Sequence, residues 1–355
     1  MSDVRMRPAL GEIAAYKPGK RPAAGQVAAR LASNETPFPP LPSVAAAVAA
    51  AAADAHRYPD PLATALVEAL AGHYAVTPDQ VSVGCGSVAL VQQLLDVTVD
   101  QGDEVVYGWR SFEAYPVLTR LAGGVGVQVP LVDSHLDLDA MRDAVTDRTR
   151  LVLLCSPNNP TGPALRRDDV VRFLADVPEH VLVVCDEAYY EFVTDPDAVD
   201  GVPLLGAHPN LAVLRTFSKA YGLAGLRAGY CLASEEVTAA MRKVTLPFSV
   251  NSVAQAAAIA SLAAADELAS RVATVVAERE AVRPALRDMG FVVPPSQGNF
   301  VWLELGELAA PVAEVLEEQG VLARTFAGDG IRVTVTEPGE TGRLLAAAEK
   351  AATLL

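Results

Sequence analysis

Between about residues 44 and 235, the chain alternates short apolar runs, rich in β-branched residues, with longer stretches of helical character. Several of these runs are continuously apolar, which is typical of strands that are covered on both faces of a sheet. Strands that alternate with helices in this way predict a largely parallel sheet with right-handed crossover connections. The seven predicted strands span residues 81–83, 104–107, 126–131, 151–155, 181–185, 212–215 and 228–232.

The pattern changes on both sides of this central region. The first 43 residues are rich in proline and polar residues and predict an extended arm that partly joins the smaller domain. After about residue 240, a long alanine-rich helical stretch from Ser252 to about Arg279 precedes short strand-like pieces at 291–293, 299–303 and 331–335. We therefore expect an α/β protein with an N-terminal arm (1–43), a large domain (44–240) and a smaller α+β domain (241–355).

Composition narrows the classes of protein that fit. With 355 residues, 51% of them hydrophobic, the chain can bury a large core. A formal charge of −15 disfavours a nucleic-acid partner, because such partners require clustered Lys and Arg. The four cysteines and five histidines show no metal-ligand spacing, so we expect buried thiols and no metal. The first ten residues lack the apolar core of a signal peptide, and we expect a cytoplasmic protein without a membrane partner.

Three predicted strands end in polar motifs. Residues 156–162 (SPNNPTG) hold the backbone in a turn, because they combine two prolines, two asparagines and a glycine. Asp186 ends a buried strand, where a carboxylate is costly unless a cation, such as a protonated pyridine nitrogen, pairs with it. Lys219 follows the strand after that, with Arg227 eight residues further on. Taken singly, these motifs are also explained by a surface turn, a helix N-cap and a solvated surface charge.

In open α/β sheets, ligands bind beyond the carboxyl ends of the strands, so Asn, Asp and Lys from the three motifs are expected at one site. These ordered motifs resemble those of fold-type I pyridoxal-5′-phosphate (PLP) enzymes. Specifically, they resemble the histidinol-phosphate aminotransferase subfamily and its aromatic-amino-acid aminotransferase relatives. The resemblance extends from YKPGK (16–20) and ASNE (32–35) to IRV (331–333). It implies a fold-type I architecture, with a seven-stranded, mostly parallel sheet in the large domain.

The resemblance also assigns roles around the PLP cofactor, which supplies an electron sink. Lys219 carries PLP as a Schiff base and later moves the Cα proton, while Asp186 keeps the pyridine nitrogen protonated. Asn159 and Tyr189 hydrogen-bond the phenolic oxygen. Phe112 stacks on the ring, although core packing would equally explain an aromatic residue there.

A phosphate group needs its own anion site. The turn that contains Cys85, Gly86 and Ser87 follows a strand and opens a helix, so its N–H groups and the helix dipole can receive phosphate. Arg227 can add a bidentate clamp. Hydroxyl groups would come from Thr216 and Ser218.

Family relatives also use a tyrosine that reaches the phosphate of the neighbouring subunit, and Tyr58 occupies the matching position. That role implies a homodimer with shared active sites. The alternative is a tyrosine that packs within its own turn.

Two arginines match substrate-binding positions of the family. Arg332 matches the residue that grips the substrate carboxylate, although a surface strand residue is the alternative explanation. Arg324 is similar to a second arginine near the acidic end of the substrate. Tyr16 and Asn34 lie in segments assigned to the same pocket.

The resemblance leaves the reaction and the substrate open to several alternatives. Decarboxylation or elimination occurs on the same scaffold, and a PLP-sensing regulator would carry an additional DNA-binding module. Within transaminases, histidinol phosphate is the alternative amino donor. The segments 108–112, 219–225 and 296–300 look closer to the bacterial aromatic-amino-acid branch. We therefore predict ping-pong transamination between an aromatic amino acid (Phe, Tyr or Trp) and 2-oxoglutarate.

Overall fold

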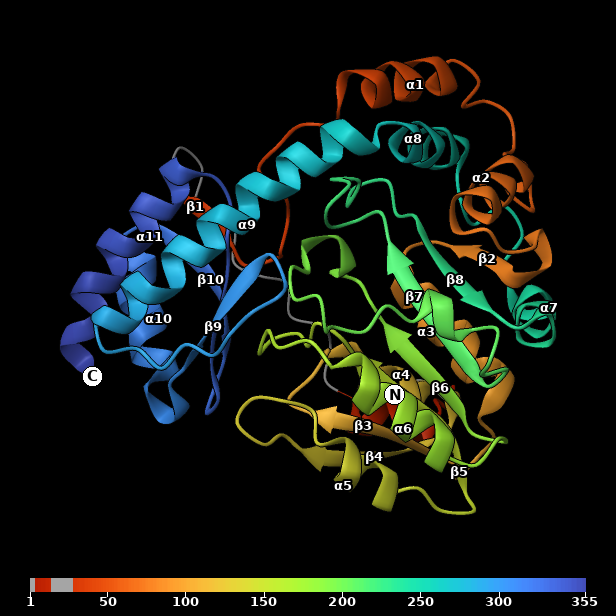
Figure 1. Cartoon of the computed structure of the whole chain (residues 1–355), viewed down its shortest axis with the longest axis horizontal. Helices are drawn as coiled ribbons and strands as arrows, with labels where there is room; N and C mark the ends of the chain where they lie inside the picture. The colour runs from red at the N-terminus through yellow and green to blue at the C-terminus, as the bar shows by residue number, and fades with distance from the viewer. Residues whose placement is uncertain (1–3, 14–27) are drawn as a thin grey trace.

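The computed structural model describes residues 4–13 and 28–355, which contain a seven-stranded and a four-stranded sheet with helices packed against both (Figure 1). The larger sheet has the strand order β2-β8-β7-β6-β5-β3-β4, and within it only β8 runs antiparallel to its neighbours. The predicted α/β class and the seven predicted strands are therefore confirmed. The strands are β2 (Val81–Gly84), β3 (Glu104–Trp109), β4 (Val125–Pro130), β5 (Thr149–Cys155), β6 (Leu182–Asp186), β7 (Leu211–Thr216) and β8 (Gly229–Ala233).

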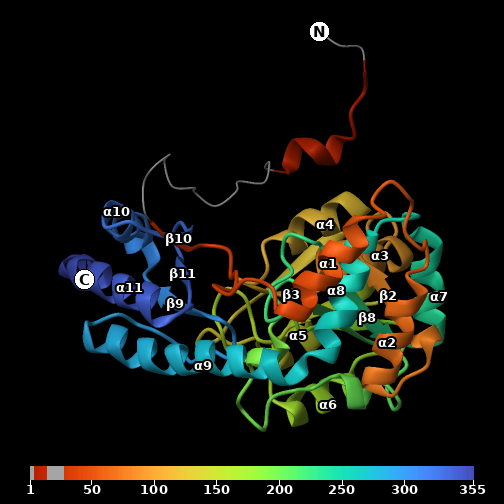
Figure 2. The same cartoon turned by 90° about the horizontal axis from the view of Figure 1, so that it is seen from above.

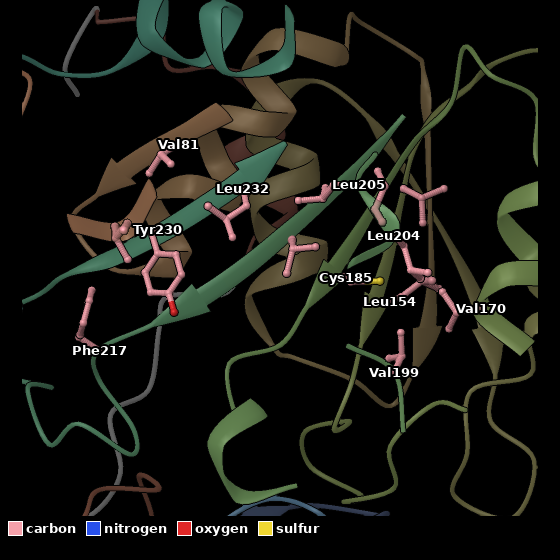
Figure 3. Packing of buried hydrophobic residues seen from close by; sticks show 14 of the residues in the cluster. Val81, Leu154, Val170, Cys185, Val199, Leu204, Leu205, Phe217, Tyr230 and Leu232 are labelled. Atoms are coloured by element: carbon pink, nitrogen blue, oxygen red, sulfur yellow. The ribbon is translucent and has the colours of Figure 1, made fainter. Parts of the chain in front are cut away.

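Helices cover both faces of this sheet, which explains its continuously apolar strands. In β6, Val183 and Cys185 enter one hydrophobic core, part of which is shown in Figure 3, while Leu182 and Val184 enter another on the opposite face. The first core is completed by α1 (Pro42–Ala52), α2 (Thr64–Tyr74), α5 (Leu138–Asp143), α6 (Arg167–Asp176) and α8 (Ser252–Ala263). The second is completed by α3 (Ser87–Thr98), α4 (Ala114–Ala122) and α7 (Glu235–Val244).

The four-stranded sheet β1-β10-β11-β9 has a hydrophobic core of its own, and we refer to this part of the structure as the smaller domain. Strand β1, which comes from the N-terminal region, pairs in parallel with β10, and the other pairs are antiparallel. The elements of this domain are β1 (Ala29–Leu31), β9 (Phe300–Glu304), β10 (Val321–Phe326), β11 (Gly330–Thr334), α10 (Ala309–Glu318), α11 (Pro338–Ala351) and the C-terminal part of α9 (Ala265–Asp288).

The packing beyond residue 240 differs from the expected domain division. Val250 and Ala254 belong to the core of the larger sheet, and α8 packs against α1 and α2. The expected single helical stretch is two helices that meet at Ala264, and α9 then runs for 24 residues towards the smaller sheet (Figures 1 and 2). We propose that α9 is the connection between the domains. The pattern at 291–293 forms only a single bridge, between Val292 and Glu304, rather than a strand.

None of the helices that the structure describes in residues 4–13 and 28–355 is both long enough and apolar enough to cross a bilayer.

Candidate active site

A cavity of about 420 Å³ lies beyond the carboxyl ends of β5, β6 and β7 and is closed on one side by residues of the smaller domain. The last residues of these strands, Cys155, Asp186 and Thr216, are buried and line the cavity. The sequence-predicted residues that line the cavity are Ser87, Phe112, Asn159, Asp186, Tyr189, Thr216, Ser218, Lys219, Arg227, Arg324 and Arg332.

Lys219 extends from the loop after β7, and its Nζ donates a 3.0 Å hydrogen bond to the Ser33 carbonyl. Burial lowers the pKa of this amine to about 7, and the positive charge of Arg332 acts in the same direction. A large fraction of the amine is therefore neutral near pH 7. Only the neutral form can attack an aldehyde carbon.

Asp186 is the last residue of β6 and is 4% exposed. Its Oδ2 accepts a 2.7 Å hydrogen bond from the Tyr115 hydroxyl, whereas its Oδ1 is buried and has no hydrogen-bond partner among the described residues. Burial raises the pKa of Asp186, and the Tyr115 bond opposes this shift. A protonated pyridine nitrogen would satisfy Oδ1 and favour the ionised form, so this carboxylate fits PLP. The next helical turn begins only at Tyr190, which argues against an N-cap role.

Asn159 and Tyr189 lie on the same cavity wall. Oδ1 of Asn159 accepts a 2.5 Å hydrogen bond from Nη1 of Arg332. The Tyr189 hydroxyl accepts a 3.0 Å bond from Nδ2 of Asn34, and burial raises the pKa of Tyr189 to about 12. Tyr189 therefore keeps its proton and can donate it to an oxygen in the cavity.

Asn34 lies behind Tyr189 and does not line the cavity. It is fully buried at a positive φ of 54°, and its backbone N–H donates to the Thr334 hydroxyl over 2.9 Å. The same hydroxyl donates to Oδ1 of Asn34 over 3.1 Å, which fixes the amide orientation. The predicted contact of Asn34 with substrate remains a prediction, while its contact with Tyr189 gives it a positioning role.

Several residues of the expected anion site lie where α3 begins. Gly86 precedes the helix at φ +80°, and a Cβ at this position would collide with the guanidinium of Arg227. Nη1 of Arg227 donates to the Ser218 hydroxyl over 3.2 Å. Ser87 and Ser218 line the cavity beside this guanidinium, so donors and positive charge meet as a phosphate requires. The side chain of Cys85 is half-buried and does not line the cavity.

The Thr216 hydroxyl accepts a bond from the Ser218 N–H over 3.1 Å and donates to the Ala228 carbonyl over 3.3 Å. It therefore shapes the loop that carries Lys219. Phe112 reaches the cavity edge and makes an edge-to-face contact with Tyr115, with ring centroids 5.5 Å apart.

The two arginines of the smaller domain have different surroundings. Arg332 in β11 is 7% exposed, which excludes the surface-strand explanation, and its Nη2 donates to the Ala32 carbonyl over 2.6 Å. Arg324 in β10 faces Glu113, with Nη2 2.9 Å and 3.0 Å from the two carboxylate oxygens. Glu113 and Tyr115 were not singled out from the sequence. Their position one and three residues after Phe112 is the only signal that the sequence offers for them.

Two further predicted residues, Tyr58 and Tyr16, are not among the described residues that line the cavity. Tyr58 is 82% exposed and stacks on Phe248 with ring centroids 4.6 Å apart, so it does not line the cavity of its own subunit. Its expected reach into a neighbouring subunit stays a prediction. Tyr16 falls outside the residues that the structure describes.

Comparison with known proteins gives the family. The family model "Aminotransferase class I and II" matches residues 28–352. An aromatic amino acid aminotransferase of Streptomyces coelicolor is 54% identical over 335 residues, which cover 94% of this chain and 93% of that protein. An aromatic amino acid aminotransferase of Thermobifida fusca is 53% identical over 344 residues, with 97% and 96% covered.

Solved structures agree with this assignment. Histidinol-phosphate aminotransferase from Sinorhizobium meliloti, in complex with PLP, has a TM-score of 0.91 at 30% identity, with 99% of both chains covered. A Thermus thermophilus aspartate aminotransferase variant shares the fold, with a TM-score of 0.84 at 23% identity over 98% of this chain and 100% of that one. The resemblance to fold-type I PLP aminotransferases is thus confirmed, and the chain belongs to the class I and II aminotransferase family.

Proposed function

We propose that the chain catalyses transamination between an aromatic amino acid and 2-oxoglutarate, with PLP bound to Lys219. One observation supports the chemistry: the Lys219 amine, whose pKa is lowered, and the buried Asp186 carboxylate, whose Oδ1 has no hydrogen-bond partner among the described residues, line the same cavity. The Streptomyces and Thermobifida relatives, both named aromatic amino acid aminotransferases, support the substrate class.

Different residues of the cavity would contact different groups of the PLP cofactor. When bound, PLP supplies the electron sink that makes the Cα proton of an amino acid acidic. Asp186, oriented by Tyr115, would hold a proton on the ring nitrogen. Arg227 and the hydroxyls of Ser87 and Ser218 would bind the phosphate. The Tyr189 hydroxyl would donate to the phenolic oxygen.

Arg332 would bind the substrate carboxylate, and Lys219 would transfer the Cα proton. Asn159 and the Ala32 carbonyl hold the Arg332 guanidinium at the cavity wall, where it can bind the α-carboxylate of donor and acceptor in turn. This contact would leave the Cα proton within reach of Lys219. With a pKa of about 7, the Lys219 amine can take up and return that proton near neutral pH.

The cavity walls favour an aromatic side chain over a phosphorylated one. Apolar groups of Val88, Phe112 and Val117 line it. Histidinol phosphate, the substrate in the name of the Sinorhizobium relative, would bring a phosphate dianion towards Arg324. Arg324 already pairs with the carboxylate of Glu113, which would repel a phosphate dianion more strongly than the singly charged carboxylate of 2-oxoglutarate.

We also propose a homodimer in which Tyr58 completes the cavity of the partner subunit. Tyr58, Leu62, Leu246 and Phe248 are large apolar side chains that are 40–82% exposed. Tyr58 and Phe248 are in contact, so these two side chains form one exposed apolar area. A cytoplasmic location is a further part of the proposal, since the four cysteines are free thiols of the kind that a reducing compartment maintains.

Steady-state kinetics with 2-oxoglutarate as acceptor tests the substrate. Phenylalanine, tyrosine, tryptophan and histidinol phosphate are compared as donors, and we expect the aromatic amino acids to give the higher kcat/KM. A preference of about tenfold or more for histidinol phosphate would contradict the proposed substrate while leaving the aminotransferase assignment in place.

A further inference from the structure

Glu113 and Arg324 form an ion pair that crosses from the large to the small domain at the cavity wall. Nε and Nη2 of Arg324 lie 2.9–3.1 Å from the two carboxylate oxygens of Glu113. Both residues line the cavity, and their side chains are 16% (Arg324) and 38% (Glu113) exposed. The pair can therefore contact a substrate side chain that reaches this part of the cavity wall.

The two cavity arginines differ in the charge of their acceptors. Arg332 donates hydrogen bonds to two neutral oxygens, of Asn159 and Ala32. Arg324 donates to a carboxylate that offsets its charge. Arg324 and Arg332 are directly paired across β10 and β11, so the arginine that pairs with a carboxylate and the arginine that bonds neutral oxygens project from adjacent positions of the sheet.

We propose that Glu113 is an internal counter-ion that determines how the enzyme discriminates between aromatic and dicarboxylic substrates. This inference rests on the proposed function, and it adds a specificity-determining residue to that site. With an aromatic substrate, the pair stays closed, so the ring meets neither an unpaired cation nor an unpaired anion. With 2-oxoglutarate, the distal carboxylate displaces Glu113 from Arg324.

Burial and chemistry make such an exchange feasible. A carboxylate is replaced by a carboxylate, so Arg324 keeps its forked acceptor geometry. Glu113 is more exposed than Arg324, so its released carboxylate can be hydrated. The energetic cost of release falls only on dicarboxylic substrates. Glu113 therefore weakens the binding of 2-oxoglutarate and its analogues relative to that of aromatic substrates.

The chain offers a matched control in Arg110 and Asp329. This ion pair also joins the two domains, with Nε of Arg110 2.9 Å from Oδ2 of Asp329 and side chains 26% and 38% exposed. Neither residue lines the cavity. Asp329→Asn removes a negative charge from the contact between the domains, as Glu113→Gln does. It leaves the charge beside the substrate side chain unchanged.

The test measures the affinity of the PLP-loaded enzyme for two unreactive ligands, glutarate and 3-phenylpropionate, by calorimetry. Glu113→Gln should bind glutarate about fivefold more tightly than wild type, as expected for a partly exposed ion pair. Its affinity for 3-phenylpropionate should not increase. Asp329→Asn should leave the ratio of the two affinities unchanged.

A double-mutant cycle links the effect to Arg324. In an Arg324→Gln background, Glu113→Gln should no longer improve glutarate binding. The inference is overturned if Glu113→Gln leaves glutarate affinity unchanged, if Asp329→Asn produces the same gain, or if the gain persists without Arg324. These ligands do not react, so the result is separate from the donor kinetics. Poor turnover of aromatic donors alongside the expected glutarate gain would contradict the proposed substrate and not the role of Glu113.

Discussion

The Tyr115 hydroxyl donates a 2.7 Å hydrogen bond to Oδ2 of Asp186, and both residues are buried beneath the candidate active site. Tyr115 extends from α4 and Asp186 ends β6, so the bond ties a covering helix to the sheet. It occupies one carboxylate oxygen and leaves Oδ1 without a partner among the described residues. Tyr115 would thereby position the carboxylate for a protonated ring nitrogen of PLP.

We predict that Tyr115→Phe folds but loses about tenfold in kcat, because a hydrogen bond to a charged group contributes about 1.5–3 kcal/mol. Losing this bond also raises the pKa of Asp186, so PLP affinity should fall, as a titration of apoenzyme can measure. Asp186→Asn is the reference variant and should lose about a hundredfold or more in kcat. A Tyr115→Phe enzyme with wild-type PLP affinity and kcat would show that the bond is only structural.

Incorporation of PLP into the apoenzyme should depend on pH through Lys219. Its pKa is lowered to about 7, so the neutral, nucleophilic amine accumulates as the pH rises from 6 to 8, and the rate should rise with it. Arg332→Gln removes a charge that lowers this pKa and should move the midpoint to higher pH. Stopped-flow absorbance gives both midpoints. A wild-type midpoint near the ordinary lysine value of about 10.4 would contradict the prediction.

Arg332→Lys should raise KM for the aromatic donor and for 2-oxoglutarate together, because one site receives both carboxylates in a ping-pong cycle. Lysine keeps the charge but loses the planar fork that contacts Asn159 and Ala32. Initial-rate measurements with each substrate varied in turn provide the comparison. A shift in only one of the two KM values would remove Arg332 as the common carboxylate anchor.

Mixing two inactive variants tests the shared active site. A heterodimer of Lys219→Ala and Tyr58→Ala subunits contains one cavity with an intact Lys219 and a partner that supplies Tyr58. We expect mixing under exchange conditions to restore activity that neither variant has alone. Absence of recovery in dimers that are shown to have exchanged subunits would place Tyr58 outside the partner's site.

Much of the large domain could be predicted because its sequence signals are local. The continuously apolar strands are set by residues within each run, and the polar ends of β5, β6 and β7 follow directly. By contrast, β1 is three residues long and pairs with residues about 290 positions away, starting with Ala29 and Val321. Strand β10 (VLARTF) has polar residues that break its apolar pattern.

Contacts within the site that join residues far apart in the sequence could not be predicted either. Lys219 and Asp186 could be predicted from motifs at strand ends, but the partners of Asp186 and Arg324 could not. Tyr115 is 71 residues from Asp186, and Glu113 is 211 residues from Arg324. Nothing in their spacing indicates a contact, since the packing of α4 and of the smaller domain creates both.

The central claim is that Lys219 carries PLP and enables transamination of aromatic amino acids. The most direct measurement combines borohydride reduction of the PLP-loaded enzyme, peptide mass spectrometry and turnover of phenylalanine with 2-oxoglutarate. We expect a phosphopyridoxyl group on Lys219 in the active wild type. Lys219→Ala should lack both the group and turnover while still binding some PLP non-covalently. Wild-type turnover in Lys219→Ala, or a phosphopyridoxyl group on a different lysine of the active enzyme, would contradict this claim.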